Sequence, residues 1–158
     1  MTERIYEEKE MVTMRFSSRL PIATHILLCL GVLGDECKFT SSVLAGSIGV
    51  NPVVVRNILG MLKAAGLVRV EQGVGGATLA RDAADITLLD VLHAVEDDSP
   101  LFHMHENPNV ACPVGRNVQA VLGSRLDGAA SAMEAELASV TLADLADDTR
   151  ALMAEQEG

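Results

Sequence analysis

The sequence predicts a mainly α-helical fold with a small β-hairpin, arranged as a winged helix-turn-helix domain followed by a long dimerisation helix. Three observations lead to this prediction: two capped helices joined by a glycine turn, a glycine-rich hairpin directly after them, and an apolar stripe at helical spacing over residues 113–140. We expect a winged helix-turn-helix domain at 14–81. Residues 82–158 then supply a connector helix, a loop, the long helix and a C-terminal helix.

Composition limits the class of protein. Of 158 residues, 49% are hydrophobic but only 3% are aromatic, which allows one domain with an aliphatic core and an extension. No apolar run approaches the roughly 18 residues that a membrane span needs. Three cysteines without a pairing pattern fit a reducing compartment. We therefore expect a cytoplasmic protein, and we assign no function to the polar leader at 1–13, which precedes a second possible start at Met14.

The charge divides the chain into two parts. The net charge is -10, which by itself argues against a nucleic-acid partner. Residues 14–81, however, hold seven basic and three acidic residues, a net charge of +4, whereas residues 82–158 hold three basic and fifteen acidic residues, a net charge of -12. This asymmetry indicates a polyanionic partner for the first part.

The first part begins with three predicted helices. A helix is expected over 18–33, with Ser17 or Ser18 as its cap. The hydroxyl groups of residues 40–42 cap a short second helix that ends at Gly49. Asn51 caps the third helix, over 52–65, which has proline at its first position. Two helices joined by a short turn that contains glycine form a helix-turn-helix.

The third helix has two different faces. Its apolar face is made of Val55, Ile58, Leu59 and Leu62. Its outer, N-terminal side carries Val53, Val54, Arg56, Asn57 and Gly60. N-terminal side chains of a recognition helix are those that reach base edges in DNA.

The stretch VRVEQGVGGATLAR, Val68 to Arg81, predicts a hairpin. Two β-prone runs at 67–70 and 76–80 flank its glycines. A phosphate-binding loop is not expected, because such loops open a helix and the Walker type contains Lys, whereas this loop opens a strand and has no Lys. The loop could be a plain turn. Its place directly after a capped recognition helix favours a wing that lies along the DNA.

The downstream part predicts three further helices. Thr87 caps one over 86–98, and after a polar loop Pro113 starts a helix of about seven turns. The last helix is expected over 141–155. The long helix carries an apolar stripe that needs a cover, either a second copy of the chain or an intrachain core, and we favour a homodimer. The stripe is Val118, Leu122, Leu126, Ala129, Met133, Leu137 and Val140.

The chain resembles the Rrf-two family of bacterial winged helix-turn-helix regulators, which includes IscR, NsrR and CymR, and two of its segments are most similar to the YwnA-type branch. The resemblance spans Met14 to about Leu145. The segments that carry it are FSSRLPIATHIL (16–27), NPVVVRNILGMLKAAGLV (from Asn51), GVGGATLAR (73–81), ITLLDVLHAVE (86–96), CPVGRN (112–117) and TLADL (141–145). The family implies a dimeric DNA-binding repressor or activator whose long helix forms the dimer interface.

The resemblance also implies which residues contact DNA. Base readout would fall to Asn51, Val53, Arg56 and Asn57, in which Arg56 can pair with guanine and Asn57 with adenine. Contacts to the phosphates would come from Ser17, Arg19, Ser41, Ser42, Gln72, Gly73 and Gly75. Many wings of the family carry Arg at the position of Gln72, so the resemblance does not imply strong insertion of this wing into the minor groove.

The cysteines and histidines give three further hypotheses. Cluster-binding members of the family use three cysteines before the dimer helix, and this chain has Cys112 alone there, so we expect no iron–sulfur cluster. His103, His105 and Cys112 are weak candidates for a Zn or Cu site. Cys112 lies at a predicted helix N-terminus, which lowers a thiol pKa, so it is a candidate redox switch or a plain cap. His25 and His93 are expected in the core or an interface.

The sequence therefore predicts a dimeric, sequence-specific regulator that binds a double-stranded DNA operator, with repression as its expected action and its effector unknown. An enzyme is not expected, because no paired nucleophile and base appears. The alternative is a dimeric interaction or ligand-sensing module that has lost DNA binding.

Overall fold

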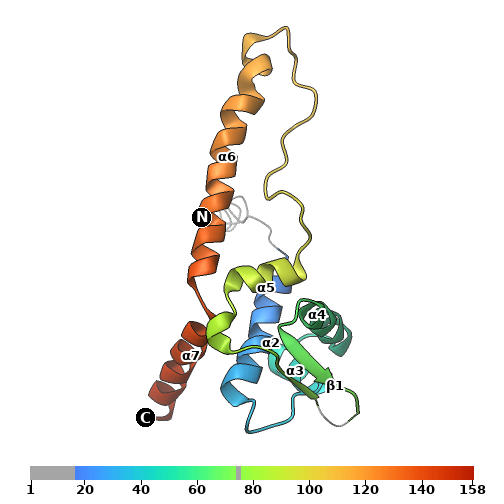
Figure 1. The fold of residues 1–158 in the computed structure, drawn as a ribbon, viewed down its shortest axis with the longest axis vertical. Helices are drawn as coiled ribbons and strands as arrows, with labels where there is room; N and C mark the ends of the chain where they lie inside the picture. The colour runs from blue at the N-terminus through green and yellow to red at the C-terminus, as the bar shows by residue number, and fades with distance from the viewer. Residues whose placement is uncertain (1–16, 74–75) are drawn as a thin grey trace, which may run out of the picture.

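The computed structural model describes residues 17–73 and 76–158. The predicted leader at 1–13 and the wing residue Gly75 lie outside these described residues. The described chain is mostly helical with one two-stranded hairpin, as predicted. Figure 1 shows a compact part from which one long helix and the loop preceding it project.

The first three described helices are α2 (Arg19–Leu33), α3 (Ser41–Ile48) and α4 (Pro52–Ala64). The Thr40 hydroxyl caps α3, and Gly49 ends it with a positive φ of 78°. Asn51 then caps α4, and its Oδ1 atom accepts a hydrogen bond of 2.9 Å from the Val53 N–H. The axes of α3 and α4 differ in direction by 111°. This angle and the short glycine turn are those of a helix-turn-helix.

The hairpin consists of β1 (Val68–Glu71) and β2 (Gly76–Leu79), paired antiparallel with Val68 opposite Leu79. The first strand is shifted by one residue from the predicted 67–70, and the second ends one residue before the predicted 76–80. Glu71 pairs with Gly76 in the ladder, whereas Leu67 and Ala80 lie outside it and are joined by an Ala80 N–H to Leu67 oxygen bond of 3.0 Å. Gly76 has a φ of 74°, and a Cβ there would lie 3.0 Å from the Phe39 carbonyl oxygen. Only glycine fits this crossing of the hairpin over the segment before α3.

One hydrophobic core joins both parts of the sequence. It contains residues from α2, α3, α4 and the hairpin, together with residues of α5 (Leu88–Val95) and α7 (Leu142–Glu157). Capping boxes begin α5 at Thr87 and α7 at Thr141, and the two threonines face one another in an isolated β-bridge. A short 3-10 helix, η1 (Ala83–Asp85), leads from the hairpin to α5. The change of charge near residue 82 is therefore not a break in packing.

Helix α5 is shorter than the predicted 86–98. It ends at Val95 because Glu96 adopts an extended conformation, and the Asp97 carboxylate then accepts the Ser99 N–H at 3.1 Å in a local turn. The loop from Glu96 runs beside α6 to its far end, where the chain turns back (Figure 1). Helix α6 spans Pro113–Ser139 and contains 27 residues. None of them is buried by the part of the chain that the structure describes.

Within residues 17–73 and 76–158, no single helix is long and apolar enough to cross a membrane. Helices α3 and α4 together have sufficient length and apolar composition, but their axes differ in direction by 111°.

Candidate nucleic-acid interface

Helix α4 has one buried face and one exposed face. Val55, Ile58, Leu59 and Leu62 are buried in the core, as the sequence predicts. On the opposite side Arg56 and Asn57 are exposed, and Val53 retains 50% of its accessible surface. The side chains that the sequence proposes for base readout therefore lie together at the N-terminal half of one exposed helix face.

Asn51 contributes to this face in a different way from the other three residues. Its Oδ1 atom is engaged in capping α4. Contact with a phosphate, which only accepts hydrogen bonds, would use the free amide NH₂ group. The cap also orients the first turn of α4, since it satisfies one of the N–H groups that the helix leaves unpaired.

The proposed phosphate contacts at the starts of α2 and α3 are accessible. Ser17, Arg19 and Ser42 are exposed, and Ser41 is half-buried. The Ser17 hydroxyl accepts the Arg19 N–H at 3.1 Å, while Ser18 occupies the cap position of α2 without a side-chain bond. The Arg19 guanidinium lies 3.4 Å from the Val95 carbonyl oxygen and 4.0 Å from the Glu96 carboxylate. Arg19 thus connects α2 to the end of α5.

The hairpin exposes its turn. Gln72 and Gly73 are exposed, and Gly73 has a φ of 87°. Arg69, in β1, donates to the Ala80 carbonyl oxygen at 3.4 Å and is also exposed. The hairpin therefore presents a cation, Arg69, while the neutral Gln72 lies at its turn.

Val54 on α4 is an exposed large hydrophobic side chain, as expected from its place on the outer side of this helix. Sequence reasoning missed Val43 on α3, which retains 46% of its accessible surface. The signal for Val43 was present in the sequence, because a valine in the first turn of a capped helix that does not fit the buried period must face outward. Apolar side chains at such positions can contact thymine methyl groups.

The chain is similar in sequence and in fold to known proteins. Residues 16–148 match the model of the Rrf2 family, described as "Iron-dependent Transcriptional regulator". The chain belongs to the Rrf2 family. It is 45% identical over 129 residues to the "Putative HTH-type transcriptional regulator YwnA" of Bacillus subtilis (strain 168), a match that covers 82% of this chain and 95% of that protein.

Solved structures agree with the fold of this Rrf2-family regulator. A crystal structure described as that of "a putative DNA binding protein" has a TM-score of 0.67 and 41% identity, covering 81% of this chain and 98% of the other. The structure of CymR, described as the global cysteine regulator of B. subtilis, has a TM-score of 0.64 at 21% identity and covers 85% of this chain and 98% of that one. The second likeness concerns the fold alone. Family and relatives are transcriptional regulators, not enzymes.

The long helix of the Rrf2-family chain has two exposed apolar regions. Leu126 and Met133 line a cavity that is formed with the chain's own loop. Val114 and Val121, which lie seven residues apart and therefore on one side of the helix, retain 72% and 66% of their accessible surface. The six residues predicted for dimerisation are all half-buried or exposed in the single chain: Val118, Leu122, Leu126, Ala129, Met133 and Leu137.

The CPVGRN segment builds the start of α6. Cys112 occupies the cap position and Pro113 the first turn, and the Arg116 guanidinium donates to the Val110 oxygen at 3.0 Å. A Cβ at Gly115 would collide with the Asn109 carbonyl oxygen. The Cys112 side chain is exposed and makes no capping hydrogen bond. The N–H groups of Gly115 and Val114 nevertheless face the thiol and hold the pKa of Cys112 below its ordinary value.

The residues present do not fit an iron–sulfur cluster. Cys29 is buried in α2, with its Sγ atom 3.6 Å from the Ser47 hydroxyl oxygen, and Cys112 is the one cysteine of the loop before α6. Such clusters need several thiolates that converge. Among the described residues, no three His, Cys, Asp or Glu side chains gather at a distance that could hold a metal ion, so His103, His105 and Cys112 are not brought together.

The structure places the two helical histidines outside the core. His25 is half-buried and its Nε2 atom lies 3.2 Å from the Ser47 hydroxyl, which joins α2 to α3. His93 is exposed on α5 and lines the cavity beside α6. A core position was therefore wrong for His93, because the α5 residues that face the core are Val91 and Val95.

Proposed function

We propose that this Rrf2-family regulator is a homodimeric repressor that binds a dyad-symmetric DNA operator in the cytoplasm. The observation that carries the proposal is the exposed N-terminal half of α4, where Arg56, Asn57 and Val53 face outward from a helix whose other side is buried. A helix held in this way can enter the major groove with its N-terminal side chains toward the base edges. The family resemblance allows a repressor or an activator, and repression is the action that we propose.

The proposed contacts divide by chemistry. Arg56 would donate two hydrogen bonds to a guanine, and Asn57 would pair with an adenine. Ser17, Arg19, Ser41, Ser42, Gln72, Gly73 and Gly75 would position the phosphates, which carry no sequence information directly. The cation Arg69 supports a phosphate contact from the hairpin in the absence of Arg at position 72.

Dimerisation is supported by the exposure of α6. A helix of 27 residues that buries no side chain in the single described chain has unpartnered apolar surface along its length. The spacing of Val114 and Val121 continues at Gly128 and Ala135, and small residues allow two helices to approach closely. A second copy of α6 would cover this face together with the predicted stripe.

Cys112 is the proposed site of a redox response. It is exposed at the start of the dimer helix, and its lowered pKa increases the fraction of thiolate. An oxidised or alkylated Cys112 would place bulk or charge at the cap of α6. Because α6 connects the two copies in the proposed dimer, this change could alter the spacing of their recognition helices.

The proposal is tested by selecting binding sites from a random DNA library with the full chain. The expected product is an inverted repeat whose half-sites are separated by about one helical turn, roughly 34–36 Å, because a two-fold protein binds two-fold DNA. Transcription in vitro from a promoter that contains this site should then fall when the protein is added. Failure to enrich any sequence would favour the alternative, a dimeric interaction or ligand-sensing module without DNA binding.

A further inference from the structure

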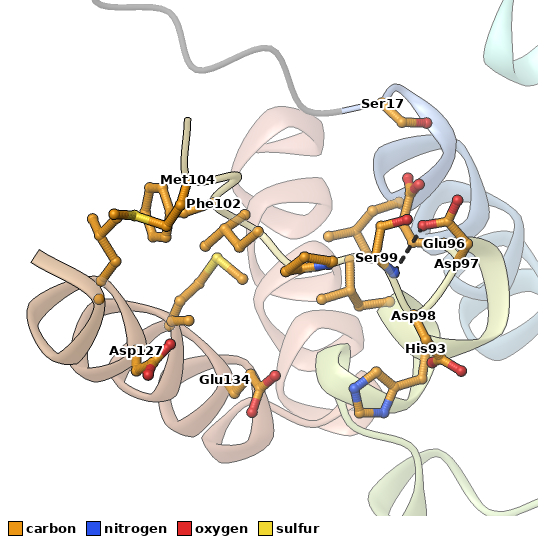
Figure 2. Close-up of a pocket in the computed structure, with 18 of the residues that line it drawn as sticks. Ser17, His93, Glu96, Asp97, Asp98, Ser99, Phe102, Met104, Asp127 and Glu134 are labelled. Carbon is orange, nitrogen blue, oxygen red and sulfur yellow. Dashed lines mark hydrogen bonds between the residues drawn. The ribbon is translucent and has the colours of Figure 1, made fainter. Parts of the chain in front are cut away.

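A cavity lies between three parts of the chain: the start of α2, the end of α5 with the loop that follows it, and the middle of α6. Its volume is about 830 Å³, and it is lined by residues of all these elements. Small-molecule sites in proteins are usually concave spaces of roughly 300–1,000 Å³. Figure 2 shows Phe102 and Met104 of the loop on one side of the space and the end of α5, with Glu96 to Ser99, on the other.

The walls of the cavity are mostly apolar. Leucine, phenylalanine and methionine side chains line it from four elements, and the methionines are unbranched and can adapt to ligands of different shape. The apolar lining includes Leu20, Leu92, Phe102, Met104, Leu126 and Met133. A ligand that fills this space would therefore need a substantial hydrocarbon or aromatic part.

The formal charges of the residues that line the cavity are all negative, although the Arg19 guanidinium lies 4.0 Å from one of them, Glu96. Five carboxylates belong to the lining, Glu96, Asp97 and Asp98 from the end of α5 and Asp127 and Glu134 from α6, and no Lys or Arg is among the residues that line the cavity. Carboxylates at the edge of a low-dielectric wall concentrate a negative potential. The Ser99 hydroxyl and N–H lower the pKa of Asp97, which keeps that carboxylate ionised.

We propose that this cavity binds a lipophilic organic cation, such as an aromatic amine or a quaternary ammonium compound, with its apolar part against Phe102 and Met133 and its charge near Asp127 and Glu134. An anionic ligand would meet five like charges, and a neutral ligand would leave Asp127 and Glu134 without a cationic partner, whereas Glu96 already has Arg19 at 4.0 Å. A second copy of the chain is the competing occupant of the space.

The position of the cavity connects it to the DNA-binding surface. Ser17 and Ser18 form part of its wall, and Glu96 lies 4.0 Å from Arg19. A cation held near Asp127 and Glu134 would add positive charge to a space that Glu96 also lines, and its field would weaken the attraction between Glu96 and Arg19, at the start of the helix that we assign to phosphate contact. This consequence rests on the proposed function, whereas the binding of a cation does not.

Two dyes of one ring system test the charge selectivity: rhodamine 6G is cationic and fluorescein is anionic. In fluorescence polarisation, rhodamine 6G should bind the full chain saturably and at least about tenfold more tightly than fluorescein, since like charges brought together at a site are strongly unfavourable. Tetraphenylphosphonium, a non-planar lipophilic cation, should displace it. Equal affinity for the two dyes would overturn the proposal.

Variants locate the binding. Ala130→Phe fills the cavity and should weaken rhodamine 6G binding by at least about tenfold, because the ring occupies the space of the ligand. The double variant Asp127→Asn with Glu134→Gln should weaken it by about fivefold through the loss of two partly solvated ion pairs. The matched control, Asp148→Asn with Glu155→Gln on exposed positions of α7, has the same net charge and should bind as the unmodified chain does.

Sedimentation and DNA binding separate the remaining outcomes. If the Asp127/Glu134 variant changes the monomer–dimer equilibrium while dye affinity stays constant, the cavity is an interface between copies and the proposal fails. If tetraphenylphosphonium binds without changing the affinity for the selected operator, the site stands and its connection to Arg19 is wrong. If no operator is found but the dyes behave as expected, the proposed function fails and the cation site stands.

Discussion

Arg56 is the residue with the clearest chemistry on the exposed face of α4. Its neighbour Val55 is fully buried, which fixes the orientation of the helix and keeps the guanidinium outside. In the proposed complex, Arg56→Ala removes a bidentate contact to guanine. The affinity should fall by roughly 1–3 kcal/mol for one base pair in each half-site, measured by competition with single-substituted operators in mobility-shift assays.

Lys63 provides the matched control for Arg56. It is exposed in the last turn of the same helix, away from the N-terminal readout side chains. Lys63→Ala should leave the base preference unchanged, because Lys63 lies outside the side chains proposed for base readout. An Arg56→Ala protein with the same base preference as the unmodified protein would remove Arg56 from base readout.

The Cys112 thiol makes a second prediction at this scale. Because neighbouring N–H groups stabilise the thiolate, its pKa is lowered and reaction with iodoacetamide should begin at lower pH than for a free thiol of pKa about 8.5. The measurement uses the Cys37→Ser variant, so that Cys112 is the exposed thiol that is followed, with mass spectrometry at a series of pH values.

The regulatory part of the Cys112 hypothesis has its own readout. Peroxide should weaken operator binding by the Cys37→Ser protein and leave the double variant Cys37→Ser with Cys112→Ser unaffected. If both proteins respond equally, or if neither responds, Cys112 is a helix cap without a switching role.

At the scale of elements, α6 is the long helix that has no buried residue in the single described chain. Leu122 retains 40% of its accessible surface and belongs to the predicted stripe. Leu122→Glu should leave the fold of each chain intact but place an unpaired charge in the proposed dimer seam, so that monomers predominate in analytical ultracentrifugation.

Ser131 gives the comparison for Leu122. It is exposed on α6, its position in the helical turn lies on the side opposite Leu122, and it is not among the residues that line the cavity. Ser131→Glu adds the same charge and should remain dimeric. A dimeric Leu122→Glu protein would place the interface on another surface.

The start of α7 predicts a pH effect. The Thr141 N–H and hydroxyl both donate to the Asp144 carboxylate, at 2.8 Å each, and they lower the pKa of Asp144. A depressed carboxyl pKa in the folded state contributes stability above the unfolded value, and this contribution is lost as pH falls through the folded pKa. The difference in Tm between the unmodified protein and Asp144→Asn should therefore shrink as pH is lowered from about 5 to 3.

This pH prediction is specific to the capping box. Asp148→Asn, on the exposed side of the same helix, should show no such convergence of Tm values. Parallel Tm curves for the unmodified protein and Asp144→Asn across the acidic range would show that the capping box does not stabilise the fold through the ionised carboxylate.

At the scale of the whole molecule, the uneven charge should make DNA binding depend strongly on salt. Each phosphate contact contributes a slope of about -0.9 to the logarithmic dependence of affinity on salt concentration. Arg19→Gln removes one proposed contact per chain, so the slope of the dimer should decrease in magnitude by about 2. Arg125→Gln, on α6, removes the same charge from each chain and should leave the slope unaltered. If the unmodified protein, Arg19→Gln and Arg125→Gln all have the same slope, Arg19 does not contact a phosphate.

Much of the fold could be predicted from local patterns. The caps at Asn51 and Thr87 were predicted correctly, and the cap of α3 is Thr40, within the predicted group 40–42, because a cap and its helix lie within a few residues of one another. The end of α5 was misplaced, because the Asp97–Ser99 turn competes with helix continuation through side-chain bonding that periodicity does not register.

The amino-acid sequence by itself determined the order of the elements, the outward face of α4 and membership in a regulator family. Only the tertiary structure decided that α7 packs against α2, that Arg19 approaches Glu96, and that an acidic, apolar-walled cavity lies beside α6. The physical reason is separation along the chain. Caps and helical periods depend on neighbouring residues, whereas the cavity unites side chains from Ser17 to Glu134 whose proximity follows only from the packing of the core.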